Sequence, residues 1–117
     1  GGGAGAIARY VLGSWIAGRL GTSFPYSTLV INVSGSFAIG VLLVFIVEHL
    51  SLDPAWRLLL VVGFLGGYTT FSSYTLEVLA LARLGEWLAA ALYVLASNGL
   101  GLAAVALGVG VARLVSR

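Results

Sequence analysis

Polar side chains recur at helical spacing within otherwise apolar stretches of this 117-residue sequence. Thr28, Asn32 and Ser36 are four residues apart and therefore share one face of a helix. A second stripe has the same spacing and consists of Tyr93, Ser97 and Gly101, with Asn98 beside them. Amide and hydroxyl hydrogens of this kind can bind an anion, or they can join helices through hydrogen bonds, and the spacing leaves both interpretations open.

A helix interruption is predicted in residues 63–74, GFLGGYTTFSSY, where paired glycines, threonines and serines follow one another. Inside a membrane, irregular backbone occurs only where it is buried in protein or faces a wet cavity. Carbonyl groups freed by a break can coordinate a cation, and the N-terminus of the second half-helix can face an anion. The alternative is a kinked helix whose hydroxyl groups bond to carbonyls one turn earlier.

Two aromatic residues within this run, Phe71 and Tyr74, are three apart, so their rings can lie on one face. The edge of an aromatic ring is positive and can meet an anion without offering it a full charge. Ordinary packing is the alternative for such a pair.

Few charged residues are available for chemistry. Arg9 lies about two turns into the first apolar stretch, where it either snorkels to the interface or raises the anion concentration at a pore mouth. Glu77 follows the predicted break and is the acid expected at membrane depth. His49 is expected in a loop without partners for a metal or a catalytic triad, and there is no cysteine. The sequence contains no pattern typical of an enzyme.

Composition identifies the environment of these residues. Hydrophobic residues make up 60% of the chain, charged residues only 9%, and the mean hydropathy is +1.08. Soluble domains carry about 25% charged residues, and a chain this short cannot bury so much apolar surface in one core. The sequence therefore predicts an all-α membrane protein, and its formal charge of +2 gives no reason to expect nucleic-acid binding.

Long uncharged runs, of 28, 19 and 26 residues, separate Arg19 from Glu48, Arg57 from Glu77, and Glu86 from Arg113. A helix needs about 20 residues to cross the hydrocarbon core. We expect one domain, residues 1–117, with four transmembrane helices at about 2–21, 25–50, 54–82 and 85–112. The first is expected to be a span rather than a signal peptide because it has no basic n-region. Pro25 and Pro54 suit first helical turns, and Ser51 and Asp53 are candidate N-caps for the third span.

The arginines give little preference for one orientation. One side of the four-span arrangement holds Arg9, Arg57, Arg113 and Arg117, and the other Arg19 and Arg83. Insertion in both orientations is therefore expected, with a single orientation as the alternative. Small residues let helices approach closely, and two small-xxx-small pairs are Ser36 with Gly40 and Ser97 with Gly101. Because four helices do not enclose a pore by themselves, a homodimer is predicted.

Three segments together resemble the Fluc (CrcB) fluoride channels of bacteria and archaea. GGGAGAIARY, residues 1–10, resembles that family's GAxxRY motif, and NVSGSFAIG, residues 32–40, resembles NxxGSFxxG. Residues 63–74 are similar to GFxGGxTTFSTF. The order, the spacing and the four-span length of the family cover essentially the whole chain.

This resemblance implies an antiparallel, dual-topology homodimer in the cell membrane with two fluoride pathways. It implies that Asn32 is the pore asparagine and Phe71 the first of two pore phenylalanines, the second being replaced here by Tyr74. It further implies a structural Na⁺ on the backbone carbonyls of Gly66 and Thr69. The remaining residues that it assigns to the pore are Arg9, Thr28, Ser72, Ser73, Tyr93 and Ser97, with Gly101 where some members have a serine.

The expected function is passive, selective export of fluoride, which enters cells as the neutral acid. A narrow passage must replace the hydration of this small anion with close donors. One alternative is a small multidrug-type, proton-coupled exporter, for which Glu77 is the candidate carboxylate. Another is a subunit that does not transport alone, or one half of a heterodimer.

Overall fold

The computed structural model describes residues 1–49 and 53–116, and the helices account for nearly all of them, without a strand in these ranges. His49, expected in a loop, is instead the last residue of a helix, and the candidate N-cap Ser51 lies outside the described residues. In chain order the elements are α1 (Gly2–Leu20), α2 (Tyr26–Leu43), the π-helical η1 (Val44–His49), α3 (Pro54–Arg57), the π-helical η2 (Leu58–Leu65), α4 (Gly66–Tyr68), α5 (Phe71–Arg83) and α6 (Trp87–Val115).

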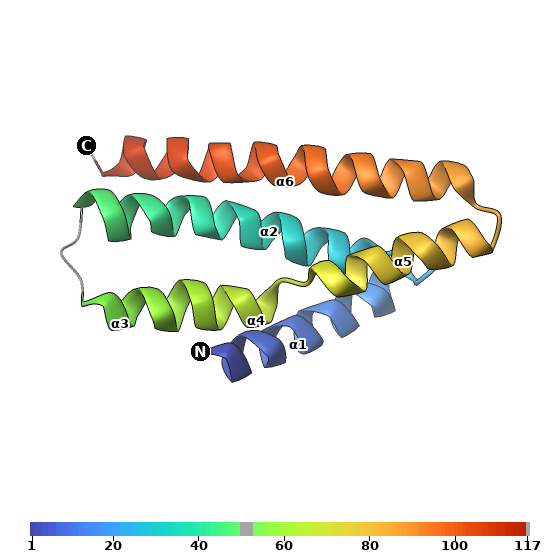
Figure 1. Cartoon of the computed structure of the whole chain (residues 1–117), viewed down its shortest axis with the longest axis horizontal. Helices are drawn as coiled ribbons and strands as arrows, with labels where there is room; N and C mark the ends of the chain where they lie inside the picture. Colours follow the sequence, from blue (N-terminus) through green and yellow to red (C-terminus); the bar gives the residue numbers. More distant parts are fainter. Residues whose placement is uncertain (50–52, 117) are drawn as a thin grey trace.

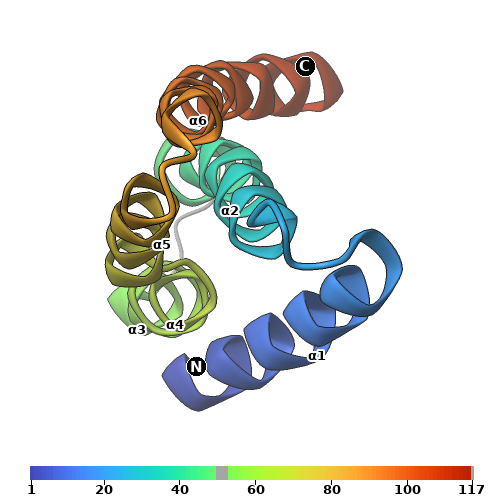
Figure 2. The same ribbon diagram turned by 90° about the vertical axis from the view of Figure 1, so that its right-hand side faces the viewer.

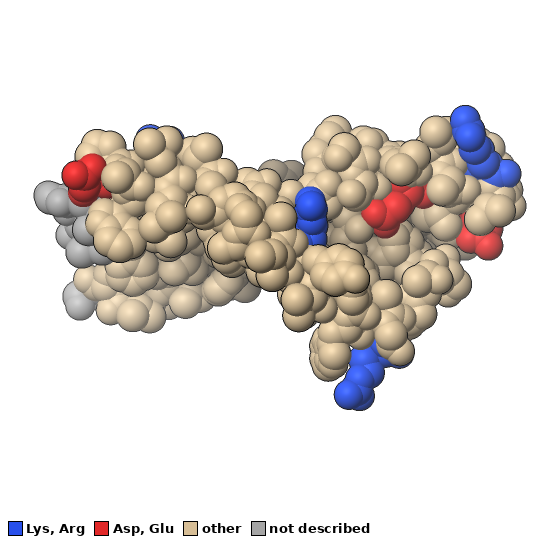
Figure 3. Space-filling view, turned by 90° about the horizontal axis from the view of Figure 1, so that it is seen from below, with Lys and Arg blue, Asp and Glu red and all other residues tan. Residues whose placement is uncertain are grey.

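Three segments in the described part of the chain are long and apolar enough to cross a membrane: Tyr26–Ile46, Pro54–Arg83 and Trp87–Val115. They match the second, third and fourth predicted spans. The first predicted span does form a helix, α1, but it is not among these three. Its glycines and two arginines, Arg9 and Arg19, lower its hydropathy. Figure 3 shows the surface that these helices produce, with few charged side chains on broad uncharged areas.

The long helix α2 lies at the centre of the arrangement. α2 and α6 run side by side in the same direction, and the segment from α3 to α5 runs the opposite way (Figure 1). Figure 2 shows α2 between α6 on one side and α1 on the other. α1 also packs against η2 and α4. This arrangement brings α2, the middle of the third segment and α6 together.

Glycines allow close approach of α2 and α6. A side chain at Gly40 would meet the carbonyl oxygen of Val105, and one at Gly108 would meet the carbonyl oxygen of Phe37. The predicted small-residue position Gly40 therefore serves packing within one chain. On the other side of the molecule, a side chain at Gly67 of α4 would meet the carbonyl oxygen of Gly2 in α1.

Gly108→Ala should destabilise the protein by about 1–3 kcal/mol, because its added methyl group would press on the backbone of α2. The matched control is Gly110→Ala on the same helix, since a Cβ at Gly110 has nothing within 4 Å. Thermal unfolding of both variants in detergent checks this. Equal melting temperatures for the two variants would contradict it.

The third segment is interrupted in its middle, as predicted. α4 ends at Tyr68, Thr69 and Thr70 are extended (φ −83°, ψ 159° and φ −151°, ψ 117°), and α5 begins at Phe71. The break lies at the two threonines, whereas Gly66 is helical. The start of the segment is also as predicted, with Pro54 in the first turn and the Asp53 side chain accepting from the backbone N–H of Ala55. In α2, Pro25 is the N-cap rather than part of the first turn.

Candidate functional site

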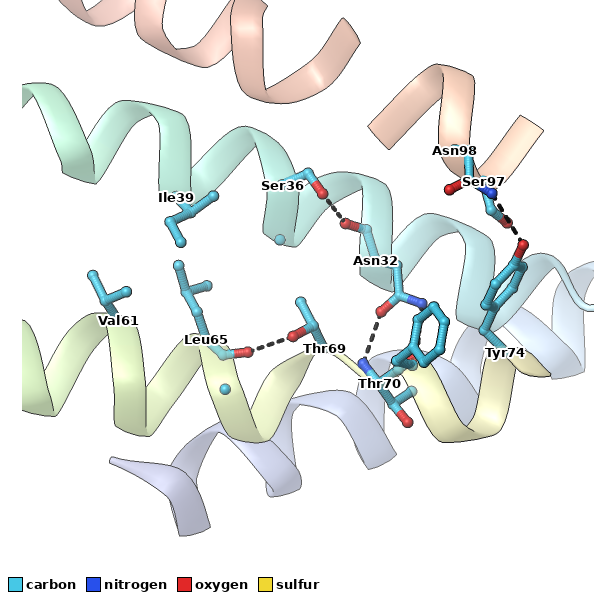
Figure 4. A pocket seen from close by; sticks show the side chains of 13 residues that line it. Asn32, Ser36, Ile39, Val61, Leu65, Thr69, Thr70, Tyr74, Ser97 and Asn98 are labelled. Atoms are coloured by element: carbon cyan, nitrogen blue, oxygen red, sulfur yellow. Dashed lines mark hydrogen bonds between the residues drawn. The ribbon is translucent and has the colours of Figure 1, made fainter. Parts of the chain in front are cut away.

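The break in the third segment is held by the side chain of Asn32 from α2. Asn32 Nδ2 donates to the carbonyl oxygen of Thr70 at 2.9 Å, and the backbone N–H of Thr70 donates to Asn32 Oδ1 at 2.8 Å (Figure 4). The amide thus replaces both hydrogen-bond partners that Thr70 would have in a continuous helix. Because Nδ2 carries two hydrogens, one donor of Asn32 remains for a ligand.

Two backbone carbonyl groups at the break lack their usual helical donors. In an unbroken helix the carbonyl of Gly66 would accept from the N–H of Thr70, but that N–H is bound to Asn32. Likewise, the carbonyl of Thr69 would accept from the N–H of Ser73, which instead donates to Thr70 Oγ1 at 3.2 Å. The two carbonyls expected to hold Na⁺ have therefore both lost their usual helical donors. Carbonyl oxygens are hard ligands of the kind that alkali cations prefer.

A cavity of about 410 Å³ lies beside the break, between α2, the third segment and α6. It brings together six of the predicted pore and sodium residues: Asn32, Gly66, Thr69, Phe71, Tyr74 and Ser97. Thr70, which the sequence pattern did not single out from its neighbours, also lines it and carries the bonds to Asn32. Apolar side chains such as Ile39, Val61 and Leu65 form much of the remaining wall. The cavity is thus mostly apolar with a few polar groups, as in many small-ligand sites.

The two aromatic residues after the break are neighbours in space. The ring centroids of Phe71 and Tyr74 are 5.5 Å apart, and Tyr74 meets Tyr93 edge-on at 5.2 Å. Phe71 is 74% exposed in the single chain, whereas Tyr74 is 8% exposed. The Tyr74 hydroxyl accepts a hydrogen bond from Asn98 Nδ2 at 3.1 Å. The aromatic rings of Phe71 and Tyr74 and the hydrogen-bonded pair of Tyr74 and Asn98 therefore lie together in the wall of the cavity.

Thr28 and Tyr93 belong to a second cluster, around Glu77. Thr28 Oγ1 donates to Glu77 Oε1 at 2.7 Å, and the Tyr93 hydroxyl donates to Glu77 Oε2 at 3.3 Å. Thr28 and Glu77 line another cavity, of about 470 Å³, beside the α1–α2 connection. Tyr93 is fully buried and its ring contacts Phe24 as well as Tyr74. The structure thus separates these residues from the Asn32 cavity and links the two clusters through the Tyr74–Tyr93 contact.

The other three predicted site residues, Arg9, Ser72 and Ser73, line neither of these two cavities. Ser73 takes part in capping α5 through its backbone N–H, which donates to Thr70 Oγ1, and its Oγ accepts from that atom at 3.1 Å. Ser72 Oγ is 3.5 Å from the same atom on the exposed side. Arg9 is half-buried on α1. Capping at a helix start is the ordinary role of such serines and threonines, and the sequence pattern did not distinguish it from pore lining.

Comparison with known proteins places this chain in a family. Residues 1–109 match the family model described as "CrcB-like protein, Camphor Resistance (CrcB)". A fluoride-specific ion channel FluC of Roseiflexus sp. (strain RS-1) is 57% identical over 111 residues, which cover 95% of this chain and 90% of the relative. Another, from Acidobacterium capsulatum, is 51% identical over 108 residues, covering 92% and 86%. A third, from Solibacter usitatus, is 52% identical over 113 residues, covering 97% and 93%. The chain is therefore a member of the CrcB family.

Proposed function

We propose that this protein is a fluoride-selective channel of the cell membrane that lets fluoride leave the cell passively. The observation that carries the proposal is the mid-segment break, where Asn32, Phe71 and Tyr74 meet at one cavity. Several CrcB relatives of similar length are named fluoride-specific ion channels, which supports fluoride as the ion that this protein conducts.

The cavity suits a small anion that holds its water tightly. The second N–H of Asn32 and the hydroxyls of Tyr74 and Ser97 are neutral donors, and the edge of Phe71 adds a weak positive potential. Neutral donors can replace hydration without trapping the ion as an arginine would. Once a second copy narrows the passage, its apolar walls would exclude larger anions.

A second copy of the chain would complete the pathway. Phe71 is 74% exposed, and the cavity that it lines is open to the outside of one chain. The segment that carries Phe71 is long and apolar enough to cross a membrane, so the polar groups of this open cavity need a cover that lipid does not provide. Two antiparallel copies would cover this face, and the nearly even distribution of arginines is compatible with both orientations. In this arrangement α1 is the fourth span, since its 19 residues give a length of about 28 Å.

A sodium ion is proposed on the carbonyls of Gly66 and Thr69, where the two copies would meet. The residues fit because Asn32 and Thr70 have taken the usual helical donors of these carbonyls. When bound, sodium would supply a fixed positive charge and hold the two breaks against each other.

The sodium proposal predicts that the dimer melts at a higher temperature in NaCl than in choline chloride. A ligand that binds only the folded state stabilises it by about 2.7 kcal/mol at a hundred times its Kd. Protein purified without sodium should be measured in both salts, with KCl as a control for ionic strength. Equal melting temperatures in all three salts would contradict a structural sodium site.

The channel function is tested with liposomes that contain only this protein, loaded with fluoride and followed with a fluoride-selective electrode. We expect rapid fluoride efflux without a proton gradient and much slower chloride efflux. Chloride efflux comparable to that of fluoride would refute selectivity, and no efflux would indicate that another subunit is required. Efflux that depends on a proton gradient and disappears in Glu77→Gln would instead favour the proton-coupled exporter.

A further inference from the structure

Asn98 fixes the direction of the hydrogen bond that it makes with Tyr74. Asn98 Nδ2 donates to the Tyr74 hydroxyl oxygen at 3.1 Å and to the carbonyl oxygen of Val94 at 2.9 Å. An amide nitrogen only donates, so the Tyr74 oxygen is the acceptor in this bond. The proton of Tyr74 is therefore still available for another partner.

A second unused hydroxyl lies in the same cavity. Ser97 Oγ is buried and has no hydrogen-bond partner among the described residues. Within the same part of the chain, no hydrogen bond has Tyr74 as its donor. Both side chains line the cavity at the helix break, and Figure 4 shows them close together beside Asn98. Buried hydroxyls that donate to nothing are unfavourable, so this pair suits a ligand that only accepts hydrogen bonds.

We propose that Tyr74 and Ser97 form a two-hydroxyl subsite for fluoride, and that Asn98 is the positioning residue that keeps the Tyr74 proton for the anion. This inference rests on the proposed channel function and specifies one binding step in it. Donation from Asn98 polarises the phenol and strengthens the bond that it offers in turn. Fluoride is a strong acceptor and small enough to contact two neighbouring hydroxyls. Tyr74 stands where the family has its second pore phenylalanine, and its hydroxyl is a donor that a phenylalanine lacks.

The test compares Tyr74→Phe, Asn98→Ala and the double variant in fluoride-loaded liposomes, with the fluoride concentration varied. A hydrogen bond to a charged group contributes about 1.5–3 kcal/mol, so Tyr74→Phe should raise the half-saturating fluoride concentration about tenfold or more. Asn98→Ala should raise the half-saturating fluoride concentration in the wild-type background. The same substitution should have no further effect in the Tyr74→Phe background, because Asn98 acts through the Tyr74 hydroxyl.

Tyr68→Phe is the matched control, since its hydroxyl pairs with Ser34 at 2.8 Å and lines neither cavity. This variant should keep wild-type half-saturation. Should Asn98→Ala fail to fold, Asn98→Leu removes the same donor with an apolar side chain of similar size. Wild-type half-saturation in Tyr74→Phe would overturn the subsite, and an equal Asn98 effect in both backgrounds would overturn the positioning role. Absence of fluoride efflux from the wild type would instead refute transport by this chain alone.

Discussion

Replacing Asn32 with alanine is expected to lower fluoride efflux from liposomes at least a hundredfold. The variant loses both hydrogen bonds to the backbone of Thr70 and removes an amide donor from the cavity. An unsatisfied buried polar group costs about 1–3 kcal/mol, and two such groups in Thr70 suffice for this effect on the conducting geometry. The fluoride electrode measures the loss directly.

Assembly and transport can be separated in this variant. We expect Asn32→Ala to keep the fold of the subunit and hence its ability to dimerise, because the α2–α6 contact at Gly40 and Gly108 within one chain is distant from the break along α2. Gel filtration in detergent measures the dimer. Thr75→Ala is the control, since its hydroxyl is exposed and bonds back to Ser72 within α5. Wild-type efflux in Asn32→Ala would exclude this residue from the pathway.

The sequence was sufficient to predict a break within residues 63–74 but not which of these residues would open. The extended residues are Thr69 and Thr70. The reason lies 38 positions earlier, where Asn32 supplies a donor and an acceptor to Thr70. Gly67 has a different function, since it allows α1 to approach α4 closely. No local pattern contains such a long-range pairing.

The polar residues of α2 were predicted to share one helix face, but their contacts within the chain lie in different places. Residues four apart share a face, yet each step moves about 6 Å along the axis. Thr28 therefore reaches Glu77, Asn32 reaches Thr70, and the Ser36 hydroxyl donates to the carbonyl of Asn32 in its own helix. One stripe thus serves separate clusters. Periodicity determines direction around a helix, and only the packed structure determines what lies opposite.

The three apolar spans were readily predicted because uncharged length is a property of sequence alone. The first helix is different, since glycines such as Gly5 let it approach the backbone of the third segment. A side chain at Gly5 would meet the carbonyl oxygen of Phe64, so this glycine contributes to packing while adding little hydropathy. The span predicted from composition at residues 2–21 forms the helix α1, but α1 is not among the three segments that are long and apolar enough to cross a membrane.

Phe71→Ile is expected to lower fluoride efflux at least a hundredfold while leaving folding almost unchanged. The Phe71 side chain is 74% exposed in the single chain, so its replacement creates no cavity in the subunit core. Isoleucine is apolar and fills space but has no positive ring edge to offer an anion. An effect on transport without an effect on subunit stability would therefore identify the ring itself as the functional group.

Leu76→Ile on the same helix is the matched control, because Leu76 is 66% exposed and lines neither cavity. The free energy of unfolding of both variants should lie within about 0.5 kcal/mol of the wild-type value, as it usually does for substitutions at exposed positions. Only Phe71→Ile should lose fluoride efflux. If both variants lost it, the exposed face of α5 would act through packing against its partner rather than through the aromatic edge. If neither did, fluoride would have to cross the cavity on the donors of Asn32, Tyr74 and Ser97 alone.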